Sequence, residues 1–371
     1  MRADGVGLSQ VAFSPPDPPT AVLLAGPVLA CCTAFWLVRL LRHNRIAALR
    51  ILDEPNARSL HSAPVPRTGG IGVLAGVATG LGLTLPWLGA PIAFWPVAAT
   101  ALLAVVSLLD DRRHVPARYR LAAQVAAAGL VMVGGLAWQV PGLPGLGGVA
   151  LPGWLVPVIT IVFVVWMTNL YNFMDGMDGL AGGMAVLGFG GLAVLGALGN
   201  AHGFALVAAV IAAAAVGFLP HNLPRAGIFL GDVGSAVLGF WAALLVLWGA
   251  GRGLFPLWAG LLVFSPFLVD ATWTLLGRLA RGEAVWRAHR EHHYQRLVLA
   301  GWSARRTLAW AYVLMAAAAA SAVGARDLNS REQWLLLAGW AGVYGLVHLR
   351  VALAERQGAA AQGGPSGTPR S

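Results

Sequence analysis

The amino-acid sequence predicts an all-α fold, a polytopic membrane bundle of about eleven transmembrane helices with its functional loops on one face. Of the 371 residues, 58% are apolar and only 11% are charged, and the mean hydropathy is +0.71. A soluble domain carries roughly 25% charged residues. Because no polar stretch is long enough for a second domain, we expect one integral membrane domain over residues 1–355. A disordered cytoplasmic tail, rich in Gly, Ala, Ser and Pro, is expected over residues 356–371.

Apolar runs of about 20 residues, enough to cross roughly 30 Å of hydrocarbon, recur along the chain. The first run exceeds the roughly 7–15 residues of a signal-peptide core and its Arg residues follow it, so we expect a retained helix. The spacing of Gly72, Gly76 and Gly80 predicts close packing, because small residues let membrane helices approach one another. The expected spans lie near residues 21–41, 70–88, 91–109, 119–138, 154–170, 180–198, 203–220, 234–250, 254–276, 306–324 and 333–353.

The positive charge of the chain is carried by 25 Arg residues, and the sequence contains no Lys. Of these, 21 lie on one side of the predicted bundle and 4 on the other. Basic residues collect on the cytoplasmic side of membrane proteins, so we expect an external N-terminus and a cytoplasmic C-terminus in a bacterial inner membrane. The Arg residues lie in short loops between spans. Membrane lipid or substrate phosphate is therefore a better partner for them than nucleic acid.

Four short polar clusters stand at the edges of the apolar runs. They begin at Asp110, Asn169, Asp232 and His289, roughly 55–65 residues apart, which is the length of two spans with their connections. A chain that crosses twice returns to its starting face, so all four clusters are expected at the cytoplasmic face. Ionisable groups beside hydrocarbon are costly, which favours a functional role. Their carboxylates would repel one another without a cation, and oxygen ligands suit Mg²⁺, with Mn²⁺ as an alternative.

The first cluster is the pair Asp110 and Asp111, which ends an apolar run. One interpretation is a helix-end pair neutralised by Arg112 and Arg113. Carboxylates at a helix C-terminus oppose the macrodipole, however, so stability alone would not favour acids there. A functional role is the better hypothesis.

The second cluster is a run of polar residues that recur every three positions. On a straight helix the first and last of them would point about 180° apart. They can share one site only if the chain bends, and Gly176 and Gly179 supply that freedom. The four residues are Asn169, Asn172, Asp175 and Asp178.

The third cluster, residues 231–235, opens another span with the sequence Gly-Asp-Val-Gly-Ser. Free N–H groups at such a helix start bind phosphate, although Asp232 could also be a plain N-cap. Asn222 and Phe229 lie just upstream and are expected on the same face of the membrane.

The fourth cluster contains His289, His292 and His293, which share one face if the segment is helical. Zinc is an alternative, but no Cys or suitable fourth ligand stands nearby. Imidazoles that face phosphate at the membrane surface fit better. Asp270 is an acid inside an apolar run; it could pair with Arg278, pair with a neighbouring helix or line a lipid route.

Taken together, these motifs resemble the polyprenyl-phosphate N-acetylhexosamine-1-phosphate transferases of glycosyltransferase family 4. The resemblance covers roughly residues 50–305. Residues 53–61 and 66–70, which include Arg67, are similar to the first cytoplasmic loop of the family. The other matching stretches are the pair 110–111, residues 169–180 and residues 229–235.

The resemblance implies that N-acetylhexosamine-1-phosphate passes from its UDP derivative to undecaprenyl phosphate, with release of UMP. By motif, Asp232 would be the Mg²⁺ ligand, and Asp110 and Asp111 would position or deprotonate the lipid phosphate. Asp175 and Asp178 would act on the nucleotide side, and His292 would be the catalytic imidazole of the histidine motif. Implied substrate-binding residues are Arg67, Asn169, Asn172, Asn222, Phe229 (on uracil), His289, His293 and Arg296.

Two departures narrow the resemblance. The aspartate pair is followed by Arg-Arg-His rather than by the third acid that many relatives carry. The histidine motif reads His-x-x-His-His-Tyr-Gln-Arg-Leu instead of His-x-His-His, and His292 aligns with the first family histidine. The Tyr-Gln-Arg-Leu form is similar to the branch that initiates O-antigen or related surface glycans with N-acetylated 6-deoxyhexosamines. The lipid I-forming enzyme is disfavoured, because its extended histidine motif is missing.

A polytopic ion-coupled transporter is the rival class, since transporters carry acids near the membrane midplane. Only Asp270 is expected to lie deep, whereas the other acids sit at one face. A CDP-alcohol phosphotransferase is disfavoured because its D-x-x-D-G-x-x-A-R spacing is absent. The transferred sugar, the glycan pathway and a homodimeric state are left open.

Overall fold

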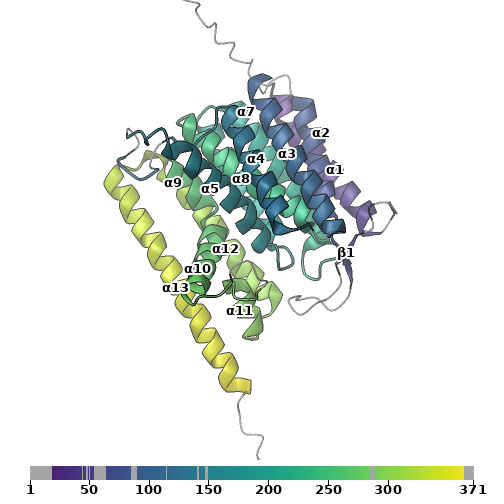
Figure 1. Cartoon of the computed structure of the whole chain (residues 1–371), viewed down its shortest axis with the longest axis vertical. Coiled ribbons are helices and arrows are strands. Elements are labelled where there is room, and N and C mark those ends of the chain that lie inside the picture. Colours follow the sequence, from purple (N-terminus) through teal and green to yellow (C-terminus); the bar gives the residue numbers. More distant parts are fainter. Residues whose placement is uncertain are drawn as a thin grey trace, which may run out of the picture.

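The computed structural model describes residues 19–43, 45–46, 49, 51–53, 64–84, 90–113, 115–139, 142–146, 149–284 and 289–362. These residues form a helical bundle with a two-stranded antiparallel hairpin at one end (Figure 1). The predicted all-α fold class is confirmed. Most of residues 53–61, which resemble the first cytoplasmic loop of the family, lie outside the described residues.

The described part of the chain contains thirteen α-helices. They are α1 (Thr20–Arg42), α2 (Gly69–Thr84), α3 (Ala90–Arg112), α4 (Ala117–Val133), α5 (Leu155–Phe173), α6 (Leu180–Leu198), α7 (His202–Asn222), α8 (Gly231–Gly251), α9 (Leu257–Val263), α10 (Ser265–Ala280), α11 (His293–Leu299), α12 (Ala304–Gly324) and α13 (Ser330–Gln362). A 3₁₀ turn, η3 (Ala325–Asp327), follows α12. Strands β1 (Leu52–Asp53) and β2 (Val65–Pro66) pair with Leu52 opposite Pro66.

Each expected span coincides with a helix, except that the run near 254–276 is divided into α9 and α10, which meet at an angle of 82°. Eight of the described helices are long and apolar enough to cross a membrane, or nine if this bent pair is one span. Helices α2 and α4 have 16 and 17 residues, at the short end of what crosses a bilayer. A multi-pass membrane protein is therefore supported, and the count of eleven spans stays a prediction.

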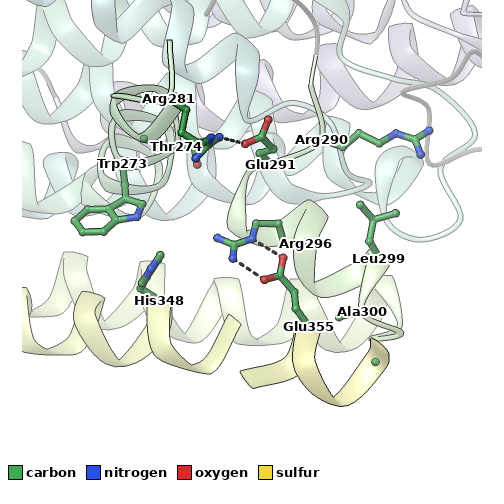
Figure 2. A pocket seen from close by; sticks show the side chains of 12 residues that line it. Trp273, Thr274, Arg281, Arg290, Glu291, Arg296, Leu299, Ala300, His348 and Glu355 are labelled. Carbon is green, nitrogen blue, oxygen red and sulfur yellow. Dashed lines mark hydrogen bonds and ion pairs between the residues drawn. The ribbon is translucent and has the colours of Figure 1, made fainter. Parts of the chain in front are cut away.

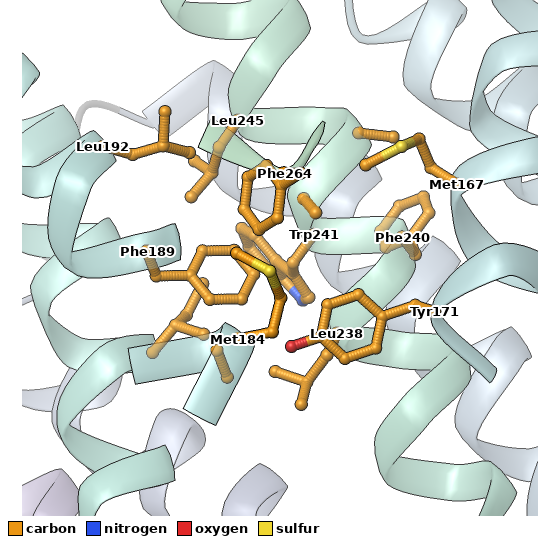
Figure 3. Packing of buried hydrophobic residues seen from close by; sticks show 14 of the residues in the cluster. Met167, Tyr171, Met184, Phe189, Leu192, Leu238, Phe240, Trp241, Leu245 and Phe264 are labelled. Carbon is orange, nitrogen blue, oxygen red and sulfur yellow. The ribbon is translucent and has the colours of Figure 1, made fainter. Parts of the chain in front are cut away.

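Helix α8 lies at the centre of the bundle, and 94% of its most apolar 18-residue stretch is buried. It is apolar on every side, as expected for a helix surrounded by other helices rather than by lipid. Phe240 and Trp241 of α8 pack with Tyr171 of α5 and Phe264 beside α9 (Figure 3). At Gly239, α8 approaches α5 so closely that a Cβ would lie 2.5 Å from a backbone oxygen. This contact fixes the position of α8 along the axis of α5.

The expected glycine packing of α2 is confirmed against α1. A Cβ on Gly72 would meet Val38, and a Cβ on Gly76 would lie 2.5 Å from the carbonyl oxygen of Ala30. Close contact between small residues replaces the hydrophobic effect as the source of attraction between helices in lipid. It brings the start of α2 beside the start of α8, where the third polar cluster lies.

Candidate active site

The first and third clusters meet at the N-terminus of α8. Asp111, in the last turn of α3, accepts hydrogen bonds from the backbone N–H groups of Asp232 and Val233, both at 3.3 Å. The positive end of a helix dipole attracts a carboxylate. The Arg67 guanidinium forms an ion pair with Asp111 and lies 3.5 Å from Asp232 Oδ1. Arg67 thus bridges two carboxylates that come from helices distant in the sequence.

A short backbone ladder brings Arg67 to this position. The N–H of Phe229 donates to Pro66 O at 2.7 Å, and the N–H of Gly70 donates to Leu230 O at 2.7 Å. Gly231 has φ = +73°, and a Cβ there would lie 2.1 Å from the carbonyl oxygen of Arg67. Only glycine fits such a close approach with positive φ. These backbone hydrogen bonds join two loops, and no repeating pattern of residue types in the sequence marks them, so they were not predicted.

The second cluster reaches the same point through Asn172, in the last turn of α5. Its Nδ2 donates to Asp232 Oδ1 at 3.0 Å and to Ser235 Oγ at 2.9 Å. The structure therefore brings residues of three of the four predicted clusters together. Ser235 joins the site as a further polar residue, which the sequence indicated only as part of the Gly-Asp-Val-Gly-Ser stretch.

The expected bend lies between α5 and α6, where Gly179 has φ = +77°. Asn222 holds this turn: its Oδ1 accepts from Gly179 N at 2.9 Å, and its Nδ2 donates to Ile228 O at 2.9 Å. Asp178 accepts from the N–H of Ala226 at 2.9 Å. Asn222 and Asp178 thus join the α5–α6 turn to the loop before α8, which gives both of them a positioning role.

Asp175 lies in the same turn and faces the other carboxylates. Burial by protein atoms, together with the charge of Asp232, raises the pKa of the Asp175 carboxyl well above its usual value. Asp111 and Asp178 also act on it, and Arg67 opposes them. The described part of the site therefore has more carboxylates than cations, which favours an added cation or a proton.

The carboxylates are compatible with Mg²⁺, although they do not form a complete cage. Among the described residues, no group of three or more His, Cys, Asp or Glu side chains is arranged to hold a metal ion. Mg²⁺ is usually held by one or two carboxylates, while substrate phosphates and water supply the other ligands. The excess of carboxylates around Asp232 fits this pattern.

The two members of the aspartate pair point to different partners. Asp110 accepts from Arg120 Nη1 at 2.7 Å and from the N–H of Val115 at 2.8 Å, whereas Asp111 binds Arg67. Asn169 lies one turn before Asn172 and exchanges hydrogen bonds with Gln124. The structure therefore does not bring Asn169 to the carboxylates. The partners Arg120 and Gln124 were not identified from the sequence.

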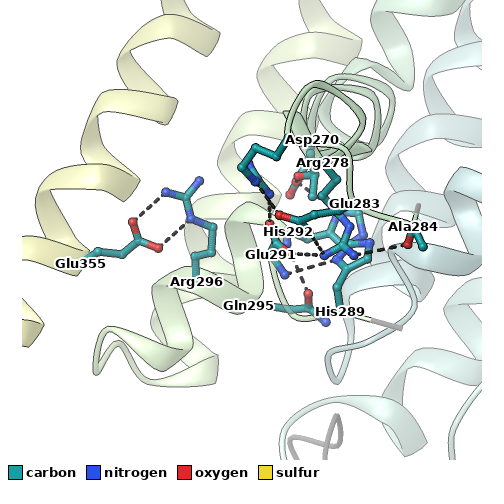
Figure 4. A network of polar contacts seen from close by, with 12 residues as sticks. Asp270, Arg278, Glu283, Ala284, His289, Glu291, His292, Gln295, Arg296 and Glu355 are labelled. Carbon is teal, nitrogen blue, oxygen red and sulfur yellow. Dashed lines mark hydrogen bonds and ion pairs between the residues drawn. The ribbon is translucent and has the colours of Figure 1, made fainter. Parts of the chain in front are cut away.

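The histidine segment lies against the α5–α6 turn, beside Phe173. Figure 4 shows His289 and His292 of this segment in a polar network with Glu291. The ring of His292 stacks on Phe173 with centroids 6.5 Å apart, and Tyr294 Oη donates to Phe173 O at 3.3 Å. Burial and the nearby His292 lower the pKa of His289 to about 4, so His289 is neutral at pH 7.

The expectation that the three histidines share one helix face is wrong. His293 is the first residue of α11, whereas His289 and His292 precede the helix. The rings of His289 and His292 are 4.9 Å apart. Asp270 Oδ1 lies 3.4 Å from His292 Nδ1 and 3.0 Å from His293 Nδ1. Because the helix starts later than the periodicity suggested, His292 acts as its N-cap and closes a capping box with Gln295.

Comparison with known proteins identifies the family. The sequence model of the family described as "Glycosyl transferase family 4" matches residues 93–250. The decaprenyl-phosphate N-acetylglucosaminephosphotransferase of Mycolicibacterium smegmatis is 32% identical over 72% of this chain and 74% of its own length. The chain belongs to this family of polyprenyl-phosphate sugar-1-phosphate transferases.

Two further relatives are similar to this chain over most of its length. A probable undecaprenyl-phosphate N-acetylglucosaminyl 1-phosphate transferase of Bacillus subtilis is 28% identical over 77% of this chain and 79% of its own length. The undecaprenyl-phosphate alpha-N-acetylglucosaminyl 1-phosphate transferase of Escherichia coli K12 is 27% identical over 77% and 80%.

In this family member, Asp270 pairs with a neighbouring helix, which is one of the alternatives considered from the sequence. Asp270 Oδ1 accepts from the backbone N–H of His293 at 2.9 Å and lies 3.0 Å from its Nδ1. Arg278 instead pairs with Glu283 and Glu291. Arg296 forms a bidentate pair with Glu355, so the structure does not bring it to the carboxylates.

Proposed function

We propose that this protein transfers N-acetylhexosamine-1-phosphate from a UDP-sugar to undecaprenyl phosphate in the bacterial inner membrane, with its site at the cytoplasmic face. The convergence of Arg67, Asp111, Asn172 and Asp232 at the start of α8 carries the proposal. It combines a guanidinium, carboxylates and a helix N-terminus, which suits two anionic phosphate substrates. The family membership supports an enzyme over an ion-coupled transporter, as does the pairing of Asp270 with the histidine segment.

In the proposed reaction, a phosphate oxygen of the lipid attacks the β-phosphorus of the UDP-sugar. The bond from that phosphorus to the oxygen bridging it to the α-phosphorus breaks, UMP leaves with the electron pair, and a lipid-linked pyrophosphate remains. Asp111 and Asp110 keep the lipid phosphate deprotonated and oriented, and Arg67 attracts the reacting phosphates. Asp175 and Asp178 lie on the nucleotide side, where Phe229 stacks on uracil.

The histidine segment completes the proposed site. His292, with its ring beside Phe173, faces the pyrophosphate or sugar, and the neutral His289 accepts or donates a hydrogen bond there. Mg²⁺, or Mn²⁺, would be held by Asp232 and would neutralise charge that develops on the departing UMP. Asn172 fixes the Asp232 carboxylate through its amide.

The donor and acceptor are tested with purified protein in detergent. We expect UMP release and a lipid-linked product with undecaprenyl phosphate and one of three donors: UDP-N-acetylglucosamine, UDP-N-acetylgalactosamine or a UDP-activated N-acetylated 6-deoxyhexosamine. The names of the relatives favour the first sugar, and the Tyr-Gln-Arg-Leu motif favours the third and an O-antigen-type glycan. A protein that releases no UMP with any of the three donors would contradict the proposed function.

Chelation provides a separate test of the cation. EDTA should abolish UMP release, and added Mg²⁺ or Mn²⁺ should restore it, because the carboxylates around Asp232 otherwise repel the incoming phosphates. The comparison is a matched amount of EDTA already saturated with Mg²⁺, which should leave the rate unchanged. Full activity in excess EDTA would exclude a divalent cation from the mechanism.

A further inference from the structure

Helix α11 is too short to hold its own position. It contains seven residues, and isolated helices shorter than about 12 residues are marginal in water. Its place therefore depends on its neighbours. On one side it rests on the α5–α6 turn, where Tyr294 Oη donates to Phe173 O and occupies the space that a Cβ on Gly176 would need.

On the other side, α11 is bound by α13. Arg296 Nε and Nη2 donate to the two carboxylate oxygens of Glu355, both at 2.7 Å (Figure 2). A bidentate pair of this kind fixes orientation as well as distance. One turn earlier on α11, His293 Nε2 lies 3.1 Å from His348 Nδ1.

The two contacts lie on a single face of each helix. His293 and Arg296 are three residues apart and share one face of α11. His348 and Glu355 are seven residues apart, which is about 20° less than two full turns, so they share one face of α13. Two polar contacts at separate points, about 4.5 Å apart along α11 and about 10.5 Å apart along α13, restrict rotation and sliding of α11 on α13.

The His293 ring is oriented from both of its nitrogens. Its Nδ1 lies 3.0 Å from the Asp270 carboxylate, which favours a proton on that nitrogen. Its Nε2 then accepts a hydrogen bond from His348 Nδ1. The His348 ring in turn packs on Trp273 of α10, with centroids 4.9 Å apart. This line of contacts joins α10, α11 and α13.

Away from α11, α13 is joined to α9 by a hydrogen bond from Trp258 Nε1 to Gln333 Oε1 and to α10 by one between Tyr344 Oη and Ser265 Oγ. Only 11% of the most apolar 18-residue stretch of α13 is buried, and the helix forms the outer edge of the molecule (Figure 1). A cavity of about 610 Å³, lined among others by Trp273, Leu299 and Glu355, lies where α13 stands away from α10 (Figure 2). The C-terminal half of α13 docks instead on residues 293–302, including Trp302, which Arg350 approaches.

We propose that α13 holds the histidine segment in its catalytic position, with His348 and Glu355 as positioning residues that act through His293 and Arg296. The role of these residues in catalysis rests on the proposed transferase function. The role of α13 in holding α11 in place does not depend on that function. Because α11 lies between α13 and the α5–α6 turn, a loosened α13 would let His292 move relative to Asp175. Residues 93–250, which match the family model, contain neither α11 nor α13.

Two variants remove the contacts without removing bulk. Glu355→Gln keeps the shape but loses the ion pair, and His348→Phe keeps a ring against Trp273 but loses the hydrogen bond. The control is Arg356→Gln, a charge change at an exposed neighbour on α13. Hydrogen exchange of the amides in residues 293–299 and steady-state kinetics are measured on the same detergent-solubilised full-length proteins.

We expect faster exchange in α11 and a kcat lowered about tenfold in both variants, with the KM for the nucleotide sugar changed less than about twofold. Arg356→Gln should match the unmodified protein in both measurements. The reversed pair Arg296→Glu with Glu355→Arg should restore slow exchange, because it rebuilds an ion pair in the same place.

Each alternative result is decisive. Unchanged exchange in both variants would overturn the proposal, and faster exchange with an unchanged kcat would reduce the contacts to a structural role and overturn the positioning role. If the unmodified protein releases no UMP with any donor, the proposed function fails, and exchange alone decides whether α13 holds α11.

Discussion

Replacing Asp232 with Asn should lower the rate of sugar-phosphate transfer about 1,000-fold, while the protein remains folded in the membrane. Asn is isosteric and its Oδ1 can still accept the hydrogen bond from Asn172, so the packing at the start of α8 survives. The negative charge that opposes Arg67 and would bind the cation is lost. The rate is measured as UMP release, and folding as a thermal unfolding midpoint in detergent.

The matched control for Asp232→Asn is Asp327→Asn. Asp327 is an exposed acid in η3, in the connection after α12, and has no part in the proposed site. The same chemical change there should leave both the rate and the unfolding midpoint unaltered. If Asp232→Asn retained more than about a tenth of the activity, Asp232 would not have the role proposed for it.

Replacing Gly70 with Ala should both destabilise the protein and remove most of its activity. A Cβ on Gly70 would lie 2.3 Å from the backbone nitrogen of Gly234 and 2.4 Å from its Cα. These are backbone atoms of α8, so no side chain can rotate away, and α2 must separate from α8. Overpacking of this kind costs roughly 1–3 kcal/mol. A shift of about 1 Å in the Arg67 loop costs roughly 100-fold in rate.

Gly82→Ala on the same helix is the control for Gly70→Ala. A Cβ on Gly82 meets nothing within 4 Å, and Ala has the higher helix propensity, so this variant should be as stable as the unmodified protein or slightly more stable. Thermal unfolding and UMP release of the two variants are compared side by side. Equal behaviour would show that α2 and α8 do not need to approach this closely.

Crossing parity predicted most of the site. Asp111, Asn172 and Asp232 come from three stretches of sequence, and the structure joins them through Arg67 and direct hydrogen bonds. Their convergence agrees with the two helices that lie between each consecutive pair of these clusters. The turn at Gly179 was also foreseen, since Asn169 and Asp178 would point about 180° apart on a straight helix.

The partners of the polar residues were harder to foresee. Asn169 binds Gln124, Asp110 binds Arg120, and Arg296 binds Glu355. Each pair joins elements that only packing brings together, and a lone Gln or Glu inside an apolar or mixed run carries no periodic signal. The start of α11 at His293 was missed for a related reason, because a seven-residue helix is set by its capping box and its neighbours.

By itself, the sequence determined an all-α membrane protein, because it contains many apolar runs of membrane length, and it predicted that the acids, amides and imidazoles between these runs gather at one face. Only the tertiary structure decided which polar residue enters the site and which serves to hold a helix. That choice depends on the rotation and height of each helix, which are set by contacts such as Gly70 on Gly234 and Gly239 on the α5 backbone. Such contacts join residues far apart in the chain, and no local pattern encodes them.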